Sequence, residues 1–368
     1  MSSKSLEQIL GYVPLLEAIE TVKKGIPNPL PPAFSTSTRS VLGNTARWIV
    51  TTGTRQTATL SQYGAAARKR AQRSVGSQDV VLMHSFEEIS FNPIVLQQLR
   101  NYSNYEVQSM GEEEVARQVG NFTELFANLR IAANMMMLVN GKLWFDGSGN
   151  LLPTSSGAIE TISVNRSANN ENQLNSLITT PWSNTGANIP NDLRKLKLRA
   201  AQDTGYEPVY ALYGSNVPGY IEQNDYVIDY LSRSPNWNSR VNESPDIPEG
   251  LFGYKWVPMY TSFFDSTGAA ADDTTPTYQT IWDPDTIVFC PEPNKQWWEV
   301  IEGSYPIPTS INVQTDAEAA LRSLKEVFGM FGYSLVALNP VSINTYMGDT
   351  FFPAIKNPAV TYAMKVSF

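Results

Sequence analysis

Hydrophobic residues follow a helical pattern over one unusually long stretch in the first half of the chain. Ser109 and Glu112 have the S-x-x-E spacing of a capping box, which predicts a helix start, and Asn140–Gly141 is a typical stop signal. The apolar positions between them lie three or four residues apart, as one buried face requires: Val115, Val119, Phe122, Phe126 and Leu129. This predicts a helix over residues 112–139, roughly 42 Å long at about 1.5 Å per residue. Such a helix suits the spine of a thin, broad subunit, and a core helix of a compact enzyme is the alternative.

Two stretches of alternating, β-branched residues flank a polar segment before this helix. The first reads RWIVTTGTRQTATL and the second VVLMHSFEEISF, and both favour strands. The segment between them, SQYGAAARKRAQRSVGS, is polar, basic and bordered by glycine. We expect an extended hairpin with a long tip. A hairpin of this length cannot bury its own surface, which indicates an intersubunit loop.

Two groups of like charge form the candidate intersubunit contact. The hairpin tip carries Arg68, Lys69, Arg70 and Arg73, and the predicted helix start carries Glu112, Glu113 and Glu114. The glutamates also suit the positive end of the helix dipole. A basic run is often only a solvated face. The sharper interpretation is that the tip contacts acidic residues of an adjacent subunit, because charge complementarity sets the register of partners. Arg70 and Glu113 are a testable pair.

The N-terminal region combines one amphipathic segment with a proline-rich one. Ser5–Lys23 has helical spacing, and the following GIPNPLPPAF contains too many prolines for a helix or a central strand. We expect an extended N-terminal arm with one short helix. The arm either reaches across to a neighbouring subunit or packs on its own domain.

The chain after the long helix reads as strands and then as a compact α/β subdomain. KLWFDGSGNLLP and AIETISVN predict two strands around a turn at Gly147–Gly149. A helix capped by Asn191 and ending near Gly205 precedes the buried strand PVYALYG, and Asn216 and Pro218 open a second helix. Helix, strand and helix in this order predict the α/β subdomain.

Strand patterns dominate the remainder of the chain. LFGYKWVPMY and DTIVFCPEP predict short strands, separated by the polar loop FFDSTGAAADDTTPTYQTIW, which we expect to be exposed. A second capping box at Thr315 and Glu318 predicts a helix that ends at Gly329. AVTYAMKVSF alternates and predicts a final strand.

Composition narrows the classes of partner. The chain has 368 residues, of which 17% are charged, and a formal net charge of −8. An acidic surface has no general affinity for nucleic acid, although it would let packed DNA slide past without sticking. Cys290 is the single cysteine, so no intrachain disulfide can form. No signal peptide or transmembrane pattern is present, and we expect no membrane association.

Candidate catalytic chemistry is sparse. His84 is the only histidine and sits within an alternating β run, where a packed or surface role is typical. A dyad with Cys290 stays open, but no flanking motif supports it. No phosphate-binding or dinucleotide-binding glycine pattern occurs, and metal sites built on Cys or His are excluded by number. Asp272–Asp273 and Asp283–Asp285 can bind a hard cation in principle, without EF-hand spacing. We therefore expect no catalytic, cofactor-binding or metal residues.

The order of these features resembles the phage-lambda-type major capsid protein family (major capsid protein E family). The resemblance begins at the basic tip ARKRAQR followed by VVLMHSFEEISFNPIVL, and continues through AANMMMLVNGKLWFDGSGNLLP. PVYALYGSNVPGYIEQNDYVIDYL, TIWDPDTIVFCPEP and NPAVTYAMKV follow in the same order. Each motif is degenerate, and their shared order is the specific part. The stretch from Thr315 to Ser334 departs from the family in being longer and more helical.

The resemblance implies an α+β, HK-97-type viral capsid fold with an N-terminal arm, an extended β-hairpin loop, a peripheral domain with a long spine helix, and an axial α/β domain. It implies an icosahedral virion shell of hexamers and pentamers, assembled in the host cytoplasm around double-stranded DNA that is bound without sequence specificity. A decoration protein, a scaffold and a portal are the further partners that it suggests. The domain boundaries that we expect are 1–38 for the arm, 39–92 for the loop, 93–180 for the peripheral domain, 181–314 for the axial domain, and 315–368 for the return to the peripheral domain with the C-terminal strand.

Two alternative functions remain. An encapsulin-like nanocompartment would have the same fold, and the contents of purified particles would distinguish it from a phage head. An enzyme or adhesin with a coincidental long helix is the other, and a turnover lost on changing His84 or Cys290 would support it.

Overall fold

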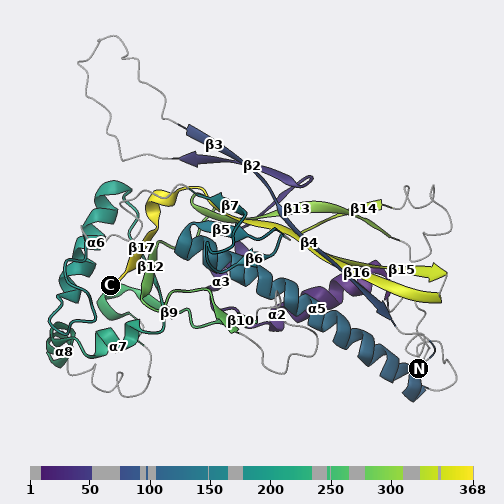
Figure 1. The fold of residues 1–368 in the computed structure, drawn as a ribbon, viewed down its shortest axis with the longest axis horizontal. Coiled ribbons are helices and arrows are strands. Elements are labelled where there is room, and N and C mark those ends of the chain that lie inside the picture. Colours follow the sequence, from purple (N-terminus) through teal and green to yellow (C-terminus); the bar gives the residue numbers. More distant parts are fainter. Residues whose placement is uncertain are drawn as a thin grey trace, which may run out of the picture.

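The protein is an elongated α+β subunit built along one long helix (Figure 1). The computed structural model describes residues 10–51, 75–91, 97, 105–147, 149–164, 177–233, 247–248, 250–264, 278–309, 324–338 and 341–367. The long helix α5 spans Tyr105–Asn140, 36 residues. At one end of the subunit lies a large sheet, and at the other lies a smaller sheet with helices α6, α7 and α8 (Figure 1).

Helix α5 confirms the predicted spine but begins earlier than its capping box suggested. Its first residue is Tyr105, so Ser109 lies inside the helix and the predicted start is wrong. Residues 105–108 contain neither proline nor glycine, so nothing in them prevents the helix from beginning before Ser109. The predicted end is confirmed, because α5 ends at Asn140 and Gly141 follows with φ +64°.

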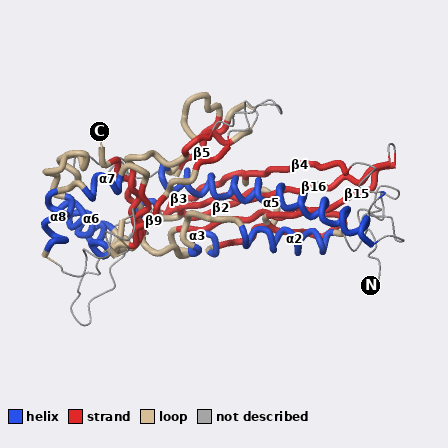
Figure 2. The backbone as a smooth tube through the Cα atoms, turned by 90° about the horizontal axis from the view of Figure 1, so that it is seen from below, coloured by secondary structure: helices blue, strands red, loops and turns tan. Residues whose placement is uncertain are grey.

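The large sheet has six strands and carries α5 and α2 on one face (Figure 2). Its order is β1-β13-β16-β15, with β14 paired to β13 and β4 paired to β16. The strands span Thr38–Val41 (β1), Met83–Phe91 (β4), Trp298–Pro308 (β13), Leu324–Phe328 (β14), Met330–Leu338 (β15) and Val341–Ile355 (β16). Apolar residues of α2, α5 and the sheet form one core cluster between them, including Ile19, Val119, Phe126, Met330 and Met347.

The N-terminal segment packs on its own subunit. Helix α2 (Tyr12–Gly25) contacts α5 and β15, and Leu15 and Ile19 are buried there. Of the two interpretations of the arm, the structure therefore supports packing on its own domain for the described residues. The proline-rich stretch also contains a short helix, α3 (Pro32–Thr36), contrary to our expectation. Proline is tolerated there because it occupies the first helical turn, where its missing N–H costs nothing.

The helix predicted to end at Gly329 is wrong over its described part, because residues 324–328 form strand β14. Residues 315–323 lie outside the described residues. Antiparallel pairing with β13 takes precedence over the local helical spacing. Gly329 has φ +71° and separates two strands. Strand β14 before it pairs with β13, and β15 after it pairs with β16. The Gly329 N–H donates to Gly303 O, and its carbonyl accepts from the Thr350 N–H.

An antiparallel hairpin projects from the body of the subunit (Figure 1). Strand β2 (Thr45–Thr51) pairs with β3 (Val75–Val81). The hairpin is as predicted, but its returning strand is β3, and most of VVLMHSFEEISF forms β4 of the large sheet instead. Residues 52–74, which include the predicted basic tip, lie outside the described residues.

The smaller sheet and its helices form an axial α/β unit. Its strand order is β17-β12-β8-β9, with β17 (Tyr362–Lys365), β12 (Thr286–Cys290), β8 (Tyr210–Tyr213) and β9 (Lys255–Pro258). The helices are α6 (Ile189–Asp203), α7 (Val217–Glu222), α8 (Asp225–Ser232) and the 3-10 turn η1 (Leu251–Gly253). The predicted C-terminal strand is confirmed and lies in this sheet. The division into domains by residue number stays a prediction.

Three details of this unit differ from expectation. Helix α6 is capped by Asn188, whose side chain accepts from the Asn191 N–H, so Asn191 is not the cap. The predicted second helix is two helices, because Asn224 ends one turn and caps α8. The predicted polar loop contains a strand pair, β10 (Ser262–Phe264) with β11 (Tyr278–Thr280).

A small third sheet follows α5 and supports the predicted strands and turn. Strand β5 (Lys142–Phe145) pairs with β6 (Leu151–Leu152) and β7 (Glu160–Ser163). The short turn η3 (Pro358–Val360) precedes β17. None of the helices within the described ranges combines the length and apolarity that crossing a bilayer would need.

Candidate assembly surfaces

An exposed ion pair joins the two strands of the β2–β3 hairpin near its base, where Trp48 is buried against Phe352. Arg47 Nε lies 2.5 Å from Asp79 Oδ1, and Arg47 Nη2 lies 2.6 Å from Oδ2. This hydrogen bond raises the pKa of Arg47 and lowers the pKa of Asp79. The pair is exposed and adds little to stability, and the register of the two strands follows from their backbone pairing. The tip residues Arg68, Lys69, Arg70 and Arg73 lie outside the described residues, and their contact stays a prediction.

The acidic group on α5 lies farther into the helix than predicted. Because α5 begins at Tyr105, Glu112, Glu113 and Glu114 follow two helical turns after its start, beyond the reach of the dipole argument. Glu114 is already paired, since it accepts from Arg117 Nη2 at 2.7 Å and Gln118 Nε2 at 2.9 Å, and these bonds lower its pKa. Glu113 is exposed and Glu112 is half-buried. Glu113 is therefore the most accessible of the three carboxylates for a neighbouring subunit.

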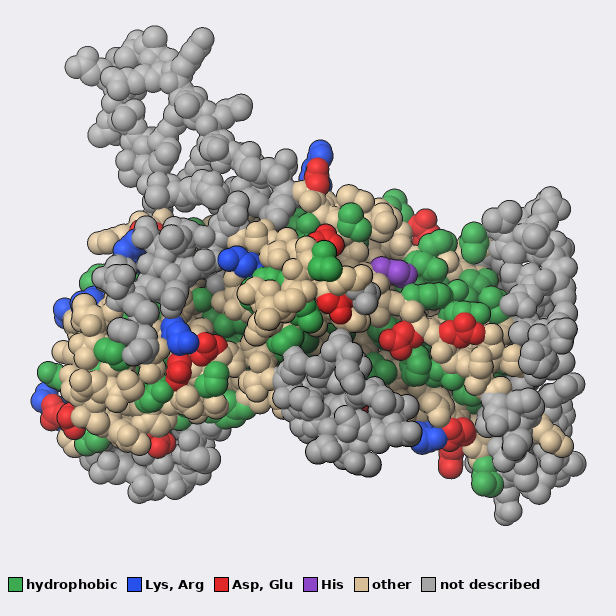
Figure 3. Space-filling model, viewed as in Figure 1, with side chains coloured by type: hydrophobic (Ala, Val, Ile, Leu, Met, Phe, Trp, Pro, Cys, Tyr) green, Lys and Arg blue, Asp and Glu red, His purple; other side chains and the backbone are tan. Residues whose placement is uncertain are grey.

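A second surface is apolar and lies on the face of the large sheet opposite the helices. Side chains alternate along β4, so Ile89 and Phe91 pack toward α2 and α5 while His84 and Phe86 point away from them. The histidine, purple in Figure 3, lies at the surface beside hydrophobic side chains. Phe86 is 40% exposed on this face. Leu324 at 46% and Phe328 at 39% lie on the other face of β14, because the neighbouring Val327 pairs with Tyr305. Exposed apolar side chains of this kind are what subunit interfaces bury.

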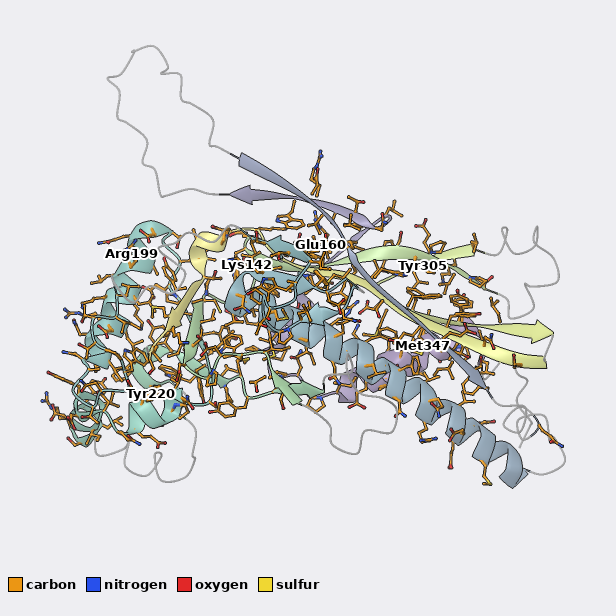
Figure 4. All side chains as sticks on the ribbon, viewed as in Figure 1. Lys142, Glu160, Arg199, Tyr220, Tyr305 and Met347 are labelled. Carbon is orange, nitrogen blue, oxygen red and sulfur yellow. The ribbon has the colours of Figure 1, made fainter. Side chains whose placement is uncertain are left out.

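His84 is packed among aromatic rings and is not part of a catalytic arrangement with Cys290. Its ring stacks on Tyr305, labelled in Figure 4, at 5.2 Å, and its Nδ1 lies 2.8 Å from Thr350 Oγ1. Burial lowers the pKa of His84, and the charge of Asp349 opposes this. Cys290 is fully buried in β12, in the other sheet. The structure therefore gives no support to a Cys–His dyad.

The carboxylates considered for a cation already have protein donors. Asp285 accepts from Tyr220, labelled in Figure 4, at 2.7 Å and from Asn216 Nδ2 at 2.9 Å. Asp283 accepts from Lys365 Nζ at 3.2 Å and from the Asp285 N–H. Asp272–Asp273 lie outside the described residues. Across the described part of the chain, no three His, Cys, Asp or Glu side chains gather as a metal site would require.

A buried ionic cluster, missed at the level of sequence, joins α5 to the large sheet. Arg130 Nη1 donates to Glu302 Oε1 at 2.7 Å, and Nε and Nη2 both donate to Asp349. The guanidinium also lies 5.0 Å from the ring centre of Phe351. Burial acts to lower the pKa of Arg130, but Asp349 and Glu302 outweigh it and raise that pKa. The only sequence signal was a lone arginine within an apolar helical stretch.

A second buried carboxylate was also missed. Glu299, in β13, is 1% exposed and lies 2.6 Å from Lys356 Nζ and 3.1 Å from Arg39 Nε. The carboxylates of both clusters are largely shielded from solvent and are not surface contacts. Both instead hold separate parts of one subunit in fixed positions, which any interface built on those parts requires.

The geometry matches solved structures along nearly the whole chain. A prophage protein of E. coli CFT073, assigned as its capsid protein, matches with a TM-score of 0.54 and 11% identity, over 97% of this chain and 99% of that chain. The chain has the HK-97-type capsid fold. A phage-related protein from Bordetella bronchiseptica RB50 has the same fold, with a TM-score of 0.51 and 12% identity over 95% of this chain and 96% of that one. No protein-family model and no curated protein sequence matches the chain.

These similarities bear on fold and not on the choice of family within it. Identities of 11% and 12% are too low to carry over residue roles. The phage-lambda-type assignment therefore stays a prediction from the sequence motifs, while the fold itself, predicted from the same motifs, is confirmed.

Proposed function

We propose that this chain is the major capsid protein of a tailed double-stranded DNA bacteriophage. The observation that carries the proposal is the end-to-end match in fold with the E. coli CFT073 prophage protein, which leaves almost no part of either chain unmatched. Subunits of this kind assemble as hexamers and pentamers that close an icosahedral shell around the genome. The protein acts as a structural component of the virion, assembled in the host cytoplasm, and not as an enzyme.

Three features of the subunit support self-assembly. The β2–β3 hairpin extends away from the body and has no further strand beside it among the described residues, so a partner surface is needed to cover it. The face that carries His84 leaves the large apolar side chain of Phe86 exposed. The elongated, broad shape gives each subunit a long perimeter over which contacts can be distributed.

The packaged DNA, a scaffold, a decoration protein and a portal are the further partners that we propose. The net charge of −8 is consistent with a wall that does not bind the genome tightly. No sequence-specific contact with DNA is proposed, since specific readout depends on basic side chains that enter a groove.

Analytical ultracentrifugation of the purified full chain tests this proposal. We expect capsomers, or shells in the megadalton range, and a stable monomer at all accessible concentrations would contradict the proposal. Analysis of particle contents then separates the two shell functions. Packaged DNA with a portal supports a phage head, and an enclosed cargo protein supports an encapsulin-like compartment instead.

A further inference from the structure

A short segment near the N-terminus lies between the large sheet and the axial sheet. We call residues 30–41 the N-terminal strap; it contains α3 and β1. Leu30 and Phe34 are both buried, at 2% and 0% exposure. They belong to a core cluster that includes residues of both sheets, such as Tyr210 of the axial sheet and Val300 of the large sheet. The strap is therefore in contact with both parts of the subunit at once.

Phe34 is one of the residues at which the two parts meet, and α5 also packs against β12 and β17 of the axial sheet. Its ring packs edge-on against Tyr210 of β8 at 6.2 Å, and against Trp297 and Trp298 at 6.1 and 5.6 Å. Its carbonyl accepts a hydrogen bond from the indole Nε1 of Trp298 at 3.0 Å. Edge-on aromatic contacts of this kind are directional, so they restrict the relative orientation of the groups that make them.

Polar contacts hold the strap in register on β13. Ser37 Oγ donates to Trp298 O at 2.9 Å, and the Val300 N–H donates to Ser37 O at 2.8 Å. Strand β1 then pairs in parallel with residues 300–303. The strap is thus fixed to the large sheet along most of its length, and Phe34 extends this contact to the axial sheet.

One connection leads from β12 of the axial sheet to β13 of the large sheet, and another leads from β16 back to β17. The strap contacts both of these connections. Trp297 lies on the connection from β12 to β13, and Lys356 lies on the connection from β16 to β17. These two connections are joined by the Lys356 N–H, which donates to Trp297 O at 2.8 Å. Phe34 packs on the first, and Arg39 shares the carboxylate of Glu299 with Lys356 of the second.

The buried charge of Glu299 makes this arrangement costly to open. Glu299 is 1% exposed, and its two cations come from the strap and from the β16–β17 connection. Removing the strap would take Arg39 away and leave the carboxylate with Lys356 alone. A buried carboxylate that loses a partner is strongly unfavourable. Separation of the strap from the sheet and movement of the connections are therefore coupled.

We propose that the N-terminal strap fixes the angle between the axial unit and the large sheet, with Phe34 as its main positioning residue. Hinge motion between two parts of a chain needs connections that are free to change their backbone angles. The strap contacts the two connections that adjoin β13 and β16, while a further connection runs from β7 to α6. The consequence for shells rests on the proposed function: subunits with one fixed angle close at one curvature, and subunits with a variable angle give particles of mixed size.

Distance measurements by spin labelling of the full chain test the strap directly. Labels are placed on Glu124→Cys in α5 and Glu222→Cys in α7, both exposed, while the native Cys290 is fully buried. Labelled protein is diluted into unlabelled protein so that only distances within one subunit are measured. We expect Phe34→Ala to broaden the distance distribution, as freed hinge motion would. Phe34→Leu, which still fills the site, should restore most of the narrow distribution.

Phe126→Ala is the matched control. Phe126 is equally buried, at 2% exposure, but packs between α2, α5 and the large sheet, away from the axial unit. This variant loses a comparable core contact and should keep the narrow distribution. If Phe34→Ala does not fold, Arg39→Gln serves as the milder variant and should broaden the distribution as well. A distribution that stays as narrow as that of the wild type in the folded strap variants overturns the proposal.

Electron microscopy of the same variants tests the consequence for assembly. Phe34→Ala should give a wider range of particle diameters than Phe126→Ala. Uniform particles from Phe34→Ala would contradict the link to curvature. If the wild-type chain forms no shells at all, the proposed function fails, whereas the spin-label distances still decide the role of the strap.

Discussion

The guanidinium of Arg130 in α5 and the carboxylate of Asp349 in β16 form a two-point ion pair that is buried between the spine helix and the large sheet. Asp349 is fully buried and the Arg130 side chain is 11% exposed. Glu302 supplies a second carboxylate from β13. One arginine therefore ties the helix to two strands that are neighbours in the sheet.

Replacement of Arg130 by methionine should strongly destabilise the fold. Methionine keeps much of the side-chain volume but leaves Asp349 and Glu302 buried without their cation. Removing one partner of a buried pair costs about 3–5 kcal/mol. Urea unfolding followed by circular dichroism should show this decrease in the free energy of unfolding. Arg117→Met, on the exposed side of the same helix, is the control and should change stability little. Equal effects of the two changes would contradict the role of Arg130.

Gly329→Ala should destabilise the protein through both backbone and packing. Gly329 has φ +71°, and an added Cβ would lie 2.7 Å from Arg130 Nη2. A residue other than glycine in this conformation costs about 1–2 kcal/mol. Gly120→Ala is a control with the opposite sign: it lies within α5, where an added Cβ meets nothing within 4 Å. That change should stabilise the helix by roughly 0.5–1 kcal/mol. A Gly329→Ala protein as stable as the wild type would contradict the requirement for glycine at this positive φ.

His84 should make stability depend on pH in the mildly acidic range. Burial holds the pKa of His84 in the folded protein below its ordinary value of 6.5, with Asp349 acting in the opposite direction. The unfolded chain therefore takes up the proton more readily, and the free energy of unfolding decreases as the pH falls through and below 6.5. His84→Gln should lack this component. Urea unfolding of both proteins between about pH 7.5 and about pH 5.5 measures the difference. Identical pH profiles would exclude this contribution.

The proposed contact between the basic tip and α5 has its own test. Alanine at Arg68, Lys69, Arg70 and Arg73 should impair assembly and leave the subunit folded. Charge reversal of either Arg70 or Glu113 should weaken assembly, and reversal of both together should restore it. Light scattering during assembly measures the effect. Normal assembly of the alanine variant would contradict the role of the tip, and failure of the double reversal would exclude this pair.

The parts of the fold that could be predicted are those in which the pattern is local. The apolar face of α5, its end at Gly141 and the strands β8, β12 and β17 follow from spacing within ten to thirty residues. The start of α5 could not be predicted, because a capping box marks a helix start only where the residues before it are not helical. Strand β14 was missed for a related reason, since its pairing with β13 decides its conformation.

The ionic clusters were beyond prediction because their members are far apart in the chain. Glu302 and Asp349 lie 172 and 219 residues from Arg130. No spacing rule relates such residues, and an isolated arginine in an apolar helix indicates only that a partner exists. The packing of α2 and the strap against their own subunit was left open for the same reason. An amphipathic pattern shows that a face is buried, but not which chain buries it.

The proposed function is an icosahedral shell built from copies of this chain. Electron microscopy of the purified full chain, followed by symmetry analysis of the particle images, is the most direct test. We expect closed particles whose capsomers are hexamers and pentamers of this chain, with α5 and the large sheet recognisable in each subunit. Monomers, or open aggregates without symmetry under every assembly condition, would contradict the claim.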